Sequence, residues 1–274
     1  MRIITWNVNG LRANVKKGCF DWFLNYSPDI YCIQETKVHP EQLEEGIRNP
    51  DDYFSYFDHS KGRKGYSGVA VYSKIKPDKI EYGLGVDELD QEGRFLALFF
   101  EKYSIEETDY KKNGKTERLG KIVLLNIYFP NGGGGPERLA FKLRYYDAFL
   151  SYINKLHKKG YEIIFCGDVN TAHKEVDLAR PKENIDNTGF LPIERAWIDQ
   201  VIASGYTDVF RYFNPDAKEK YTYWDMKTFA RDRNVGWRID YFFASDGVLK
   251  HVTKIKILDQ IMGSDHCPIE ITIG

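Results

Sequence analysis

Short apolar runs that stop abruptly at polar residues are the feature that most limits how this chain can fold. Runs of this length, rich in aliphatic and aromatic residues, are typical of β-strands. Several are apolar throughout, as expected of strands that are covered on both faces. The runs that predict strands are residues 3–6, 29–33, 53–57, 68–72, 95–100, 122–128, 163–166, 239–244 and 269–273.

Helical spacing of apolar residues appears between these runs, at residues 20–26, 138–157 and 193–203. The second segment is the clearest, and Pro136 stands where its first turn is expected. Its predicted apolar stripe consists of Leu139, Leu143, Tyr146, Leu150 and Ile153.

Strands outnumber helices and the two interleave, which predicts an α/β or α+β chain with two sheets or one large mixed sheet. No linker rich in Pro, Gly or Ser divides the sequence. The charged stretch 101–121 contains Asn113 and Gly114 and predicts a projecting β-hairpin or loop.

The composition predicts an ordered globular protein. The 274 residues are 42% hydrophobic and 29% charged. No apolar stretch approaches the ~18 residues that a membrane span needs, and no secretory signal is visible. We therefore expect a cytoplasmic protein that makes no contact with membranes.

Charge and cysteine content narrow the functional classes. The formal net charge of -1 argues weakly against a simple DNA-binding module, although a basic face can lie opposite an acidic one. The sequence has no CxxC pair, so a zinc ribbon or a redox pair is not expected. We interpret Cys19, Cys32, Cys166 and Cys267 as buried thiols.

Acidic and amide residues gather where the predicted strands end or begin. The set includes the acids Glu35, Asp168, Asp240 and Asp265 and one imidazole, His266. Oxygen ligands with few nitrogens and no thiolates suit a hard cation, Mg²⁺ or Mn²⁺, whereas zinc would need more His or Cys. The set therefore predicts a metal-assisted active site at the strand ends.

Seven strings at or near the predicted strand ends carry further information. They are TWNVNGLRA at 5–13, QETK at 34–37, YFPN at 128–131, GDVN at 167–170, NTGF at 187–190, NVGWRIDY at 234–241 and GSDHCPI at 263–269. These strings strongly resemble the exonuclease III family of AP endonucleases, which belongs to the DNase I-like phosphoesterase superfamily. They run in the order of that family from the first residues to the last, so the resemblance covers essentially the whole chain.

The resemblance implies a DNase I-like four-layer sandwich, in which two packed mixed sheets are flanked by helices. It implies that residues 1–274 form a single endonuclease/exonuclease/phosphatase domain. The implied activity is Mg²⁺-dependent hydrolysis of DNA 5′ to an abasic site, leaving a 3′-hydroxyl, with added 3′→5′ exonuclease and 3′-phosphodiesterase activities. The implied partner is double-stranded DNA with abasic sites or blocked 3′ ends, bound by a monomer.

The resemblance also implies a metal site. Glu35 is the main expected ligand, with Asn7 and Asp265 nearby. A second ion, if one binds, would use Asp168, Asn170 and His266. Some relatives carry Asp at the position of Asn9, so this chain has one negative charge fewer around the ion.

The implied catalytic residues surround the scissile phosphate. Asp168 would orient or deprotonate the attacking water, and Asn170 would hold that water. Asp240 would fix the ring of His266 and raise its pKa, so that an imidazolium stabilises the phosphate; a rival view makes His266 the general base. Tyr128 would reach the phosphate or the leaving oxygen.

Substrate contacts are expected around this centre. Asn9, Arg12, Asn131 and Asn187 would contact phosphate or the pocket wall, and Tyr223, Trp224 and Trp237 resemble the family's aromatic wall. The basic side chains expected on the DNA backbone are Arg12, Lys16, Lys17, Lys61, Arg63, Lys64, Lys227, Arg231, Arg233 and Arg238. The glycines at 132–135 occupy a loop where relatives often carry larger or basic side chains.

Two other functions are compatible with part of this pattern. Another DNase I-like phosphoesterase, acting on inositol phosphates or sphingomyelin, would share the acids but not the NGLR and NVGWR strings. A non-catalytic DNA-binding scaffold would tolerate loss of the metal acids, all of which are present.

Overall fold

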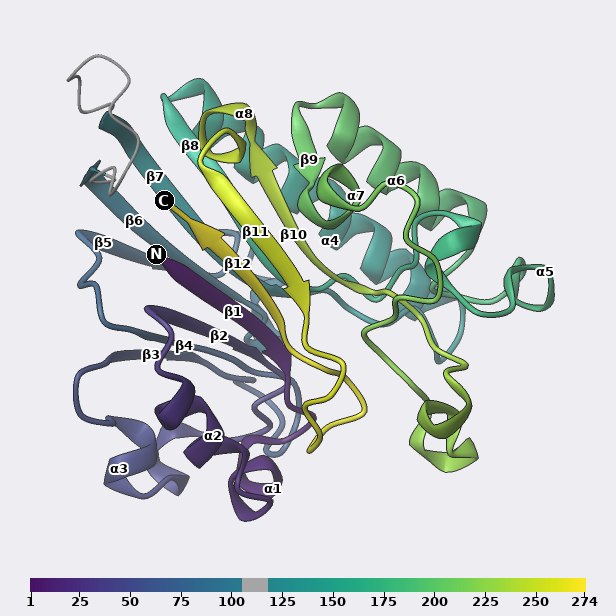
Figure 1. Ribbon diagram of the computed structural model, residues 1–274, viewed down its shortest axis with the longest axis horizontal. Coiled ribbons are helices and arrows are strands. Elements are labelled where there is room, and N and C mark those ends of the chain that lie inside the picture. The colour runs from purple at the N-terminus through teal and green to yellow at the C-terminus, as the bar shows by residue number, and fades with distance from the viewer. Residues whose placement is uncertain (105–117) are drawn as a thin grey trace.

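The computed structural model describes residues 1–104 and 118–274, with the backbone alone at 102–104 and 118–119. Its strands form two mixed six-stranded sheets that pack face to face (Figure 1). The sandwich expected from the sequence is confirmed.

The first sheet has a parallel pair, β1 with β2, near its centre, and its other neighbours are antiparallel. Its strands in spatial order are β11 (Val252–Ile257), β12 (Ile269–Ile273), β1 (Arg2–Asn7), β2 (Ile30–Gln34), β4 (Val69–Ser73) and β3 (Phe54–Asp58).

The second sheet repeats this plan with the parallel pair β7 and β8. Its strands in spatial order are β5 (Lys79–Tyr82), β6 (Phe95–Ser104), β7 (Arg118–Tyr128), β8 (Tyr161–Asp168), β10 (Asp240–Ser245) and β9 (Tyr206–Asp208).

Helices cover the outer face of each sheet (Figure 1). Those against the first sheet are α1 (Leu11–Lys16), α2 (Cys19–Tyr26) and α3 (Glu45–Arg48), and those against the second are α4 (Pro136–Lys158) and α6 (Pro192–Ala203). Shorter helices are α5 (Pro181–Asn184), α7 (Val209–Phe213) and α8 (Asp246–Leu249). The 3-10 turns are η1 (Pro40–Gln42), η2 (Asp90–Glu92), η3 (Glu175–Asp177), η4 (Met226–Thr228) and η5 (Ala230–Arg233).

The apolar core between the sheets contains a polar cluster around Asn126. Asn126 on β7 donates from Nδ2 to the backbone carbonyls of Ile33 (3.0 Å) and Ala70 (2.8 Å) in the opposite sheet. Gln34 Nε2 donates to Asn126 Oδ1 (2.6 Å) and to Thr5 Oγ1 (2.8 Å). Because unpaired buried amides are costly, these bonds favour one alignment of the two sheets.

The sequence predicted the buried strands within one or two residues at most ends, but not β5, β9 or β11. These lie at sheet edges, where charged residues or very short length weaken the apolar signal. The stretch 101–121 contributes the ends of β6 and β7, while Asn113 and Gly114 lie outside the described residues.

The stripe predicted on α4 was partly wrong. Tyr146 and Ile153 are fully buried, but Leu139, Leu143 and Leu150 are only partly covered. The face that meets the sheet consists of Lys142, Tyr145, Tyr146, Phe149, Ile153 and Leu156. It therefore includes a charged residue that hydrophobic spacing could not reveal.

All four cysteines are free and buried, as interpreted from the sequence. Among the described residues, none of the helices combines the length and the apolar character needed to cross a membrane.

Arg238 was expected on DNA, and this expectation was wrong. Its side chain is completely buried, with Nε 2.8 Å from Asp177 Oδ1 and Nη2 2.7 Å from Asp208 Oδ2. Asp177 also accepts a bond from Arg211 (2.6 Å). Burial alone would raise the pKa of the Asp177 carboxyl, but Arg238 and Arg211 hold that pKa well below its usual range. Arg238 thus joins the segment before β10 to η3 and β9.

We predict that Asp177→Asn lowers the free energy of unfolding by about 3–5 kcal/mol at pH 7, because Arg211 and the buried Arg238 lose the carboxylate that they share and Asp208 alone remains beside Arg238. A carboxyl whose pKa is depressed by folding stabilises above its unfolded pKa near 4, and that stabilisation is lost as the pH falls. The difference from the parent protein should therefore narrow below about pH 4 in urea unfolding series. Glu88→Gln, which breaks an exposed pair with Arg144, is the control and should change stability by less than about 1 kcal/mol. Equal effects of both variants would contradict the prediction.

Candidate active site

The carboxyl ends of the two parallel strand pairs meet at one end of the sandwich. Asn7 ends β1 and Glu35 follows β2, while Tyr128 ends β7 beside Asp168 at the end of β8. Asp240 begins β10 opposite Asp168 because β10 and β8 are antiparallel. Strand ends of this kind are a common location for sites in layered folds.

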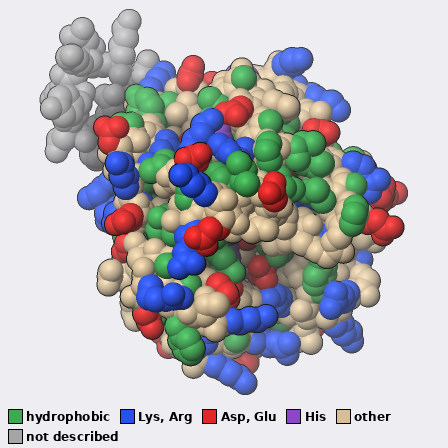
Figure 2. Space-filling model, turned by 90° about the vertical axis from the view of Figure 1, so that its right-hand side faces the viewer, with side chains coloured by type: hydrophobic (Ala, Val, Ile, Leu, Met, Phe, Trp, Pro, Cys, Tyr) green, Lys and Arg blue, Asp and Glu red, His purple; other side chains and the backbone are tan. Residues whose placement is uncertain are grey.

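A cleft of about 440 Å³ opens at this end of the molecule. The face drawn in Figure 2 is the right-hand side of Figure 1; Lys and Arg side chains are spread over its lower part, and acidic side chains are visible in a hollow there. The residues that line the cleft are Asn9, Glu35, Tyr128, Asn131, Asp168, Asn170, Thr188, Gly189, Tyr223, Asp225, Trp237, Ile239, Asp265 and His266.

Asn7 lies beneath the cleft and joins the two sheets. Its Nδ2 donates to Glu35 Oε1 and to Asp168 Oδ2, both at 2.9 Å. Its Oδ1 accepts the backbone N–H of Asn9 (3.0 Å). Asn7 therefore holds two carboxylates by its donor atom, and its expected place near a metal ion stays a prediction.

Glu35 is paired with a lysine that the sequence analysis left without a role. Lys37 Nζ lies 2.7 Å from Glu35 Oε2 and 2.5 Å from Asn9 Oδ1. Burial alone would raise the pKa of Glu35, but Lys37 and the Asn7 amide lower it. Asn9 in turn donates to Asp265 Oδ2 (3.0 Å), so Asn9 links the lysine to the second acid.

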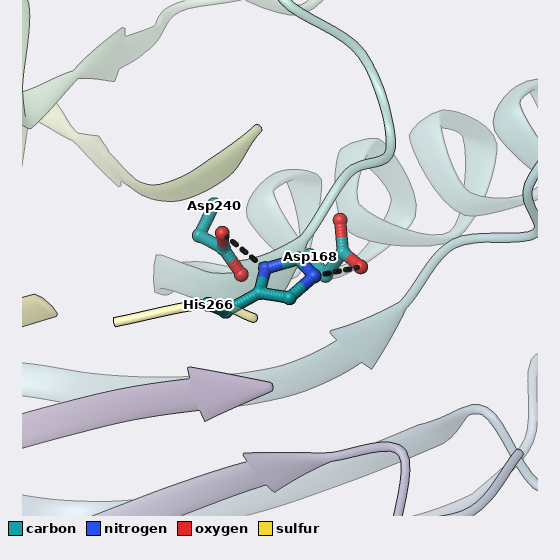
Figure 3. Close-up of side chains that lie close together, drawn as sticks. All are labelled: Asp168, Asp240 and His266. Carbon is teal, nitrogen blue, oxygen red and sulfur yellow. Dashed lines mark hydrogen bonds and ion pairs between the residues drawn. The ribbon is translucent and has the colours of Figure 1, made fainter. Parts of the chain in front are cut away.

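His266 stands between two carboxylates (Figure 3). Its Nδ1 is 2.8 Å from Asp240 Oδ2, and its Nε2 is 3.9 Å from Asp168 Oδ2. Burial alone would lower the pKa of His266, but the charge and hydrogen bond of Asp240, with Asp168, raise it to about 10. The ring is therefore an imidazolium at neutral pH, and an imidazolium has no lone pair for a metal.

Asp168 is the most deeply placed acid of the cleft. Burial, with the negative charges of Asp240 and Glu35, raises the pKa of Asp168 to about 7, although the His266 charge acts in the opposite direction. A buried acid titrating near neutrality in a cleft is a frequent property of catalytic residues.

Asn170 completes the surroundings of Asp168. Its backbone N–H donates to Asp168 Oδ1 (2.8 Å), and its Nδ2 lies 3.2 Å from Asp168 Oδ2. Asn131 Nδ2 donates to Asn170 Oδ1 (3.1 Å). The amide nitrogen of Asn170 thus faces the acid.

Tyr128 lies over an arginine that was not predicted. The Arg94 guanidinium is 4.3 Å from the centre of the Tyr128 ring, and its Nη1 donates to the Tyr128 carbonyl (3.0 Å). Arg94 is 2% exposed and is also bound to Glu92 (2.6 Å). A cation packed on a ring in this way restricts the position of the ring.

One wall of the cleft is aromatic and apolar, with Tyr223, Trp237 and Ile239. Tyr223 and Trp237 exchange backbone hydrogen bonds (both 2.9 Å). Trp224 was expected in this wall but is 3% exposed and packs with Tyr221, Ala230 and Cys267. Successive side chains of an extended segment point to opposite sides, so Tyr223 and Trp224 cannot share the wall.

Asn187 also lies outside the cleft lining. Its Nδ2 is hydrogen-bonded to Asn184 Oδ1 (2.9 Å) in the turn after α5. The next two residues, Thr188 and Gly189, line the cleft in its place. The sequence placed the string correctly but not the side chain that reaches the site.

Most basic side chains expected on DNA are exposed. Arg12 lies with Lys16 and Lys37 along a shallow groove beside the cleft. Arg231 differs, because its guanidinium donates to the backbone carbonyls of Asp259 and Ile261 (2.7 and 2.8 Å). The exposed residues of the set are Arg12, Lys16, Lys17, Lys61, Arg63, Lys64, Lys227 and Arg233.

The donor set fits a divalent cation bound between Glu35 and Asp265. Both carboxylates face the cleft, and Glu35 already attracts a cation, the Lys37 ammonium. The carboxylate and amide side chains that line the cleft offer oxygen atoms, which are the ligands that hard divalent cations prefer. One possible ligand atom from each of Asp168, Asp240 and His266 lies within 4.8 Å of the other two. The hydrogen bond between His266 and Asp240 is that of an acid–imidazole pair.

Comparison with known proteins identifies the family of the chain. The model of the Endonuclease/Exonuclease/phosphatase family matches residues 4–266, and the chain belongs to that family. It is 40% identical over the full length of both chains to an exodeoxyribonuclease of Bacillus subtilis. It is 39% identical to the DNA repair nuclease APEX1 of Danio rerio, covering 100% of this chain and 82% of the relative.

A solved structure, that of AP endonuclease LMAP from Leishmania major, superposes with a TM-score of 0.84 at 28% identity. The match covers 98% of this chain and 86% of that one. Within the phosphoesterase family, the resemblance to the exonuclease III family of AP endonucleases is thereby confirmed.

We predict that Asp240→Asn lowers the pKa of His266 from about 10 toward or below its ordinary value near 6.5, because burial is then opposed by less negative charge. Since folding raises this pKa, the imidazolium stabilises the fold below about pH 6.5, and that stabilisation disappears as the pH rises through 10. The measurement is a histidine NMR titration of the metal-free protein. Asp225→Asn removes a charge from the cleft wall without touching His266 and should leave the titration unchanged. A variant ring that still titrates near pH 10 would show that Asp240 is not the cause.

Proposed function

We propose that the protein is a Mg²⁺-dependent DNA repair endonuclease that hydrolyses the phosphodiester bond 5′ to an abasic site and leaves a 3′-hydroxyl. The observation that carries the proposal is a buried acid, Asp168, beside an imidazolium, His266, in a cleft with an apolar wall. The names of the relatives, a DNA repair nuclease and an exodeoxyribonuclease, support DNA as the substrate.

Glu35 and Asp265 would hold the ion, and Asn7 would hold Glu35 and Asp168 in place. When bound, Mg²⁺ supplies Lewis-acid stabilisation of negative charge on the phosphate and the leaving oxygen. Mn²⁺ has the same preference for oxygen ligands and would serve in its place. A second ion, if one binds, would use Asp168, Asn170 and His266, and the His266 ring would then have to lose a proton.

Asp168 would orient the attacking water and accept its proton. A general base is most effective when its pKa lies near the working pH, and that of Asp168 is about 7. Asn170, held by Asn131 and by the Phe129 carbonyl, would keep the carboxylate in one rotamer. It would exchange its 3.2 Å bond to Asp168 for one to the water or to a phosphate oxygen. The attack would be direct and in line, with no covalent intermediate.

His266 would act by its charge. An imidazolium fixed by Asp240 offers its Nε2–H to a phosphoryl oxygen, and a fixed charge in a water-poor cleft stabilises the transition state strongly. Tyr128, supported by Arg94, would donate from its hydroxyl to the phosphate or to the leaving oxygen. Burial raises the pKa of Tyr128 well above 10, so this hydroxyl keeps its proton.

The apolar wall would select the lesion. An abasic sugar has no base to unpair or unstack, so it leaves the duplex at low cost and fits against Tyr223, Trp237 and Ile239. A nucleotide that carries a base would meet this wall. The exposed basic groove with Arg12 and Lys16 would hold the flanking phosphates without reading sequence.

The same phosphoester chemistry at a 3′ end would give 3′→5′ exonuclease and 3′-phosphodiesterase activities. That the protein acts as a monomer in the cytoplasm, and that residues 1–274 form a single domain, stay predictions from the sequence.

The decisive experiment is cleavage of a duplex that contains one tetrahydrofuran abasic analogue, with analysis of the product ends, with and without EDTA. Incision 5′ to the analogue with a 3′-hydroxyl is expected, and EDTA should abolish it. Phosphate release from inositol phosphates without strand cleavage would favour the alternative phosphoesterase. DNA binding without any chelator-sensitive cleavage would favour a scaffold.

We predict that Asp168→Ala lowers the single-turnover incision rate by about 10²–10⁴-fold, because it removes the buried acid whose pKa of about 7 suits a general base. DNA binding should survive, since a negative charge near the phosphate is removed. Asp232→Ala, which removes an exposed acid of η5, should keep the parent rate. Retention of full activity by Asp168→Ala would remove this residue from the mechanism.

We predict that Glu35→Ala raises the Mg²⁺ concentration needed for half-maximal cleavage by about tenfold or more, because an anionic ligand is lost. Calorimetric titration of Mn²⁺ into the DNA-free protein should show the same weakening. Glu41→Ala, an exposed acid on η1, should leave both titrations unchanged. An unchanged metal requirement in Glu35→Ala would count against Glu35 as a ligand.

A further inference from the structure

Helices α4 and α6, which lie together against the second sheet (Figure 1), share a buried ion pair. The side chains of Lys142 and Glu194 are both 0% exposed, and Nζ lies 2.5 Å from Oε1. A buried ion pair is weak evidence for stability, because desolvation of two charges offsets their attraction and apolar substitutes are often as stable. Stability alone therefore does not account for the pair.

Lys142 binds the segment that follows β8. Its Nζ donates to the backbone carbonyl of Asn170 (2.8 Å) and to Thr171 Oγ1 (2.9 Å). Together with the bond to Glu194, these contacts use all three protons of the ammonium. Asn170 has a φ of +56°, in the left-handed region that few side chains adopt. A fixed donor to its carbonyl stabilises this conformation, which directs the Asn170 amide toward Asp168.

Glu194 binds the neighbouring segment of the cleft lining, which contains Thr188 and Gly189. Oε1 accepts from Thr188 Oγ1 (2.8 Å), and Oε2 accepts from the N–H groups of Gly189 (2.6 Å) and Leu191 (3.1 Å). The two segments are in close contact, because a Cβ at Gly189 would lie 3.3 Å from the Asn170 carbonyl and 3.4 Å from the Trp237 ring. The polar contacts of the pair therefore converge on two segments that line the cleft.

We propose that Lys142 and Glu194 are positioning residues, which set the separation between Asn170 and the Thr188–Gly189 wall and thereby act on the chemical step through Asn170. The proposal rests on the proposed function for the role of Asn170. The pair itself makes no contact with substrate, since both side chains lie beneath the surface of the cleft. Loss of the pair should therefore lower the rate of cleavage and leave the affinity for DNA unchanged.

The test compares Lys142→Met with the parent protein in single-turnover cleavage at saturating DNA. A displacement of about 1 Å in a catalytic group can cost about 100-fold in rate, so a loss of about 10- to 100-fold is expected with an unchanged DNA dissociation constant. Lys142→Arg, which keeps the cation and its donors, should recover most of the rate. Arg144→Met, on the same helix but in an exposed ion pair, is the matched control and should behave as the parent.

Lys142→Gln/Glu194→Gln provides a neutral pair that keeps hydrogen-bonding groups, and it decides the question if Lys142→Met does not fold. A parent rate per folded molecule in either folded variant would overturn the proposal, as would loss of DNA affinity at constant rate. Each variant is assayed on the abasic duplex and on removal of nucleotides from a recessed 3′ end. If the parent protein removes nucleotides from the 3′ end but does not cleave the abasic duplex, the proposed function is wrong. The rates of the variants and the parent can then still be compared at the 3′ end. The Asn170 side-chain amide resonance, which should shift in Lys142→Met and not in Arg144→Met, gives a readout that needs no activity.

Discussion

The hydrogen bonds that cross between the two sheets are the constraint on which the rest of the structure depends. Apolar surfaces alone would tolerate several alignments, since dispersion and hydrophobic contacts are not directional. Gln34 and Asn126 must be paired when buried, and their partners lie in opposite sheets in one alignment. That alignment brings the end of β1 to the end of β8, so that Asn7 can bind Asp168 directly. The site is therefore a product of how the sheets are joined, and not of any one loop.

Several carboxylates lie together in the cleft, where burial raises the free energy of a charged group. The pKa of Asp168 is raised to about 7 for this reason. The charges of the neighbouring acids are balanced by cations: His266 lies beside Asp240, and Lys37 lies beside Glu35. Each of these cations also binds a second group of the site. The side chains that balance the charge of the cleft thus also fix the positions of its acids.

The sequence predicted the layered fold and most cleft residues, because buried strands carry continuous apolar runs and parallel strand ends meet at one edge. Its errors have a common physical origin in segments where neighbouring side chains face opposite ways. Tyr223 and Trp237 reach the cleft, while the adjacent Trp224 and Arg238 turn into the interior. The string that contains Arg238 does not show its acidic partners, which are 61 and 30 residues away along the chain. Lys142 was missed for the same reason, since its partner Glu194 belongs to another helix.

The Lys37 ammonium has a consequence for the protein in the absence of divalent ions. Clustered carboxylates with no cation among them repel one another, which weakens a fold that depends on a bound ion. Many small metalloproteins unfold when a chelator is added, because the free energy of metal binding is part of their folding free energy. Here the chain provides a tethered positive charge of its own against Glu35, on a short left-handed turn that keeps it within reach. Loss of the ion should therefore stop catalysis without unfolding the protein, because the Lys37 ammonium still balances the charge of Glu35.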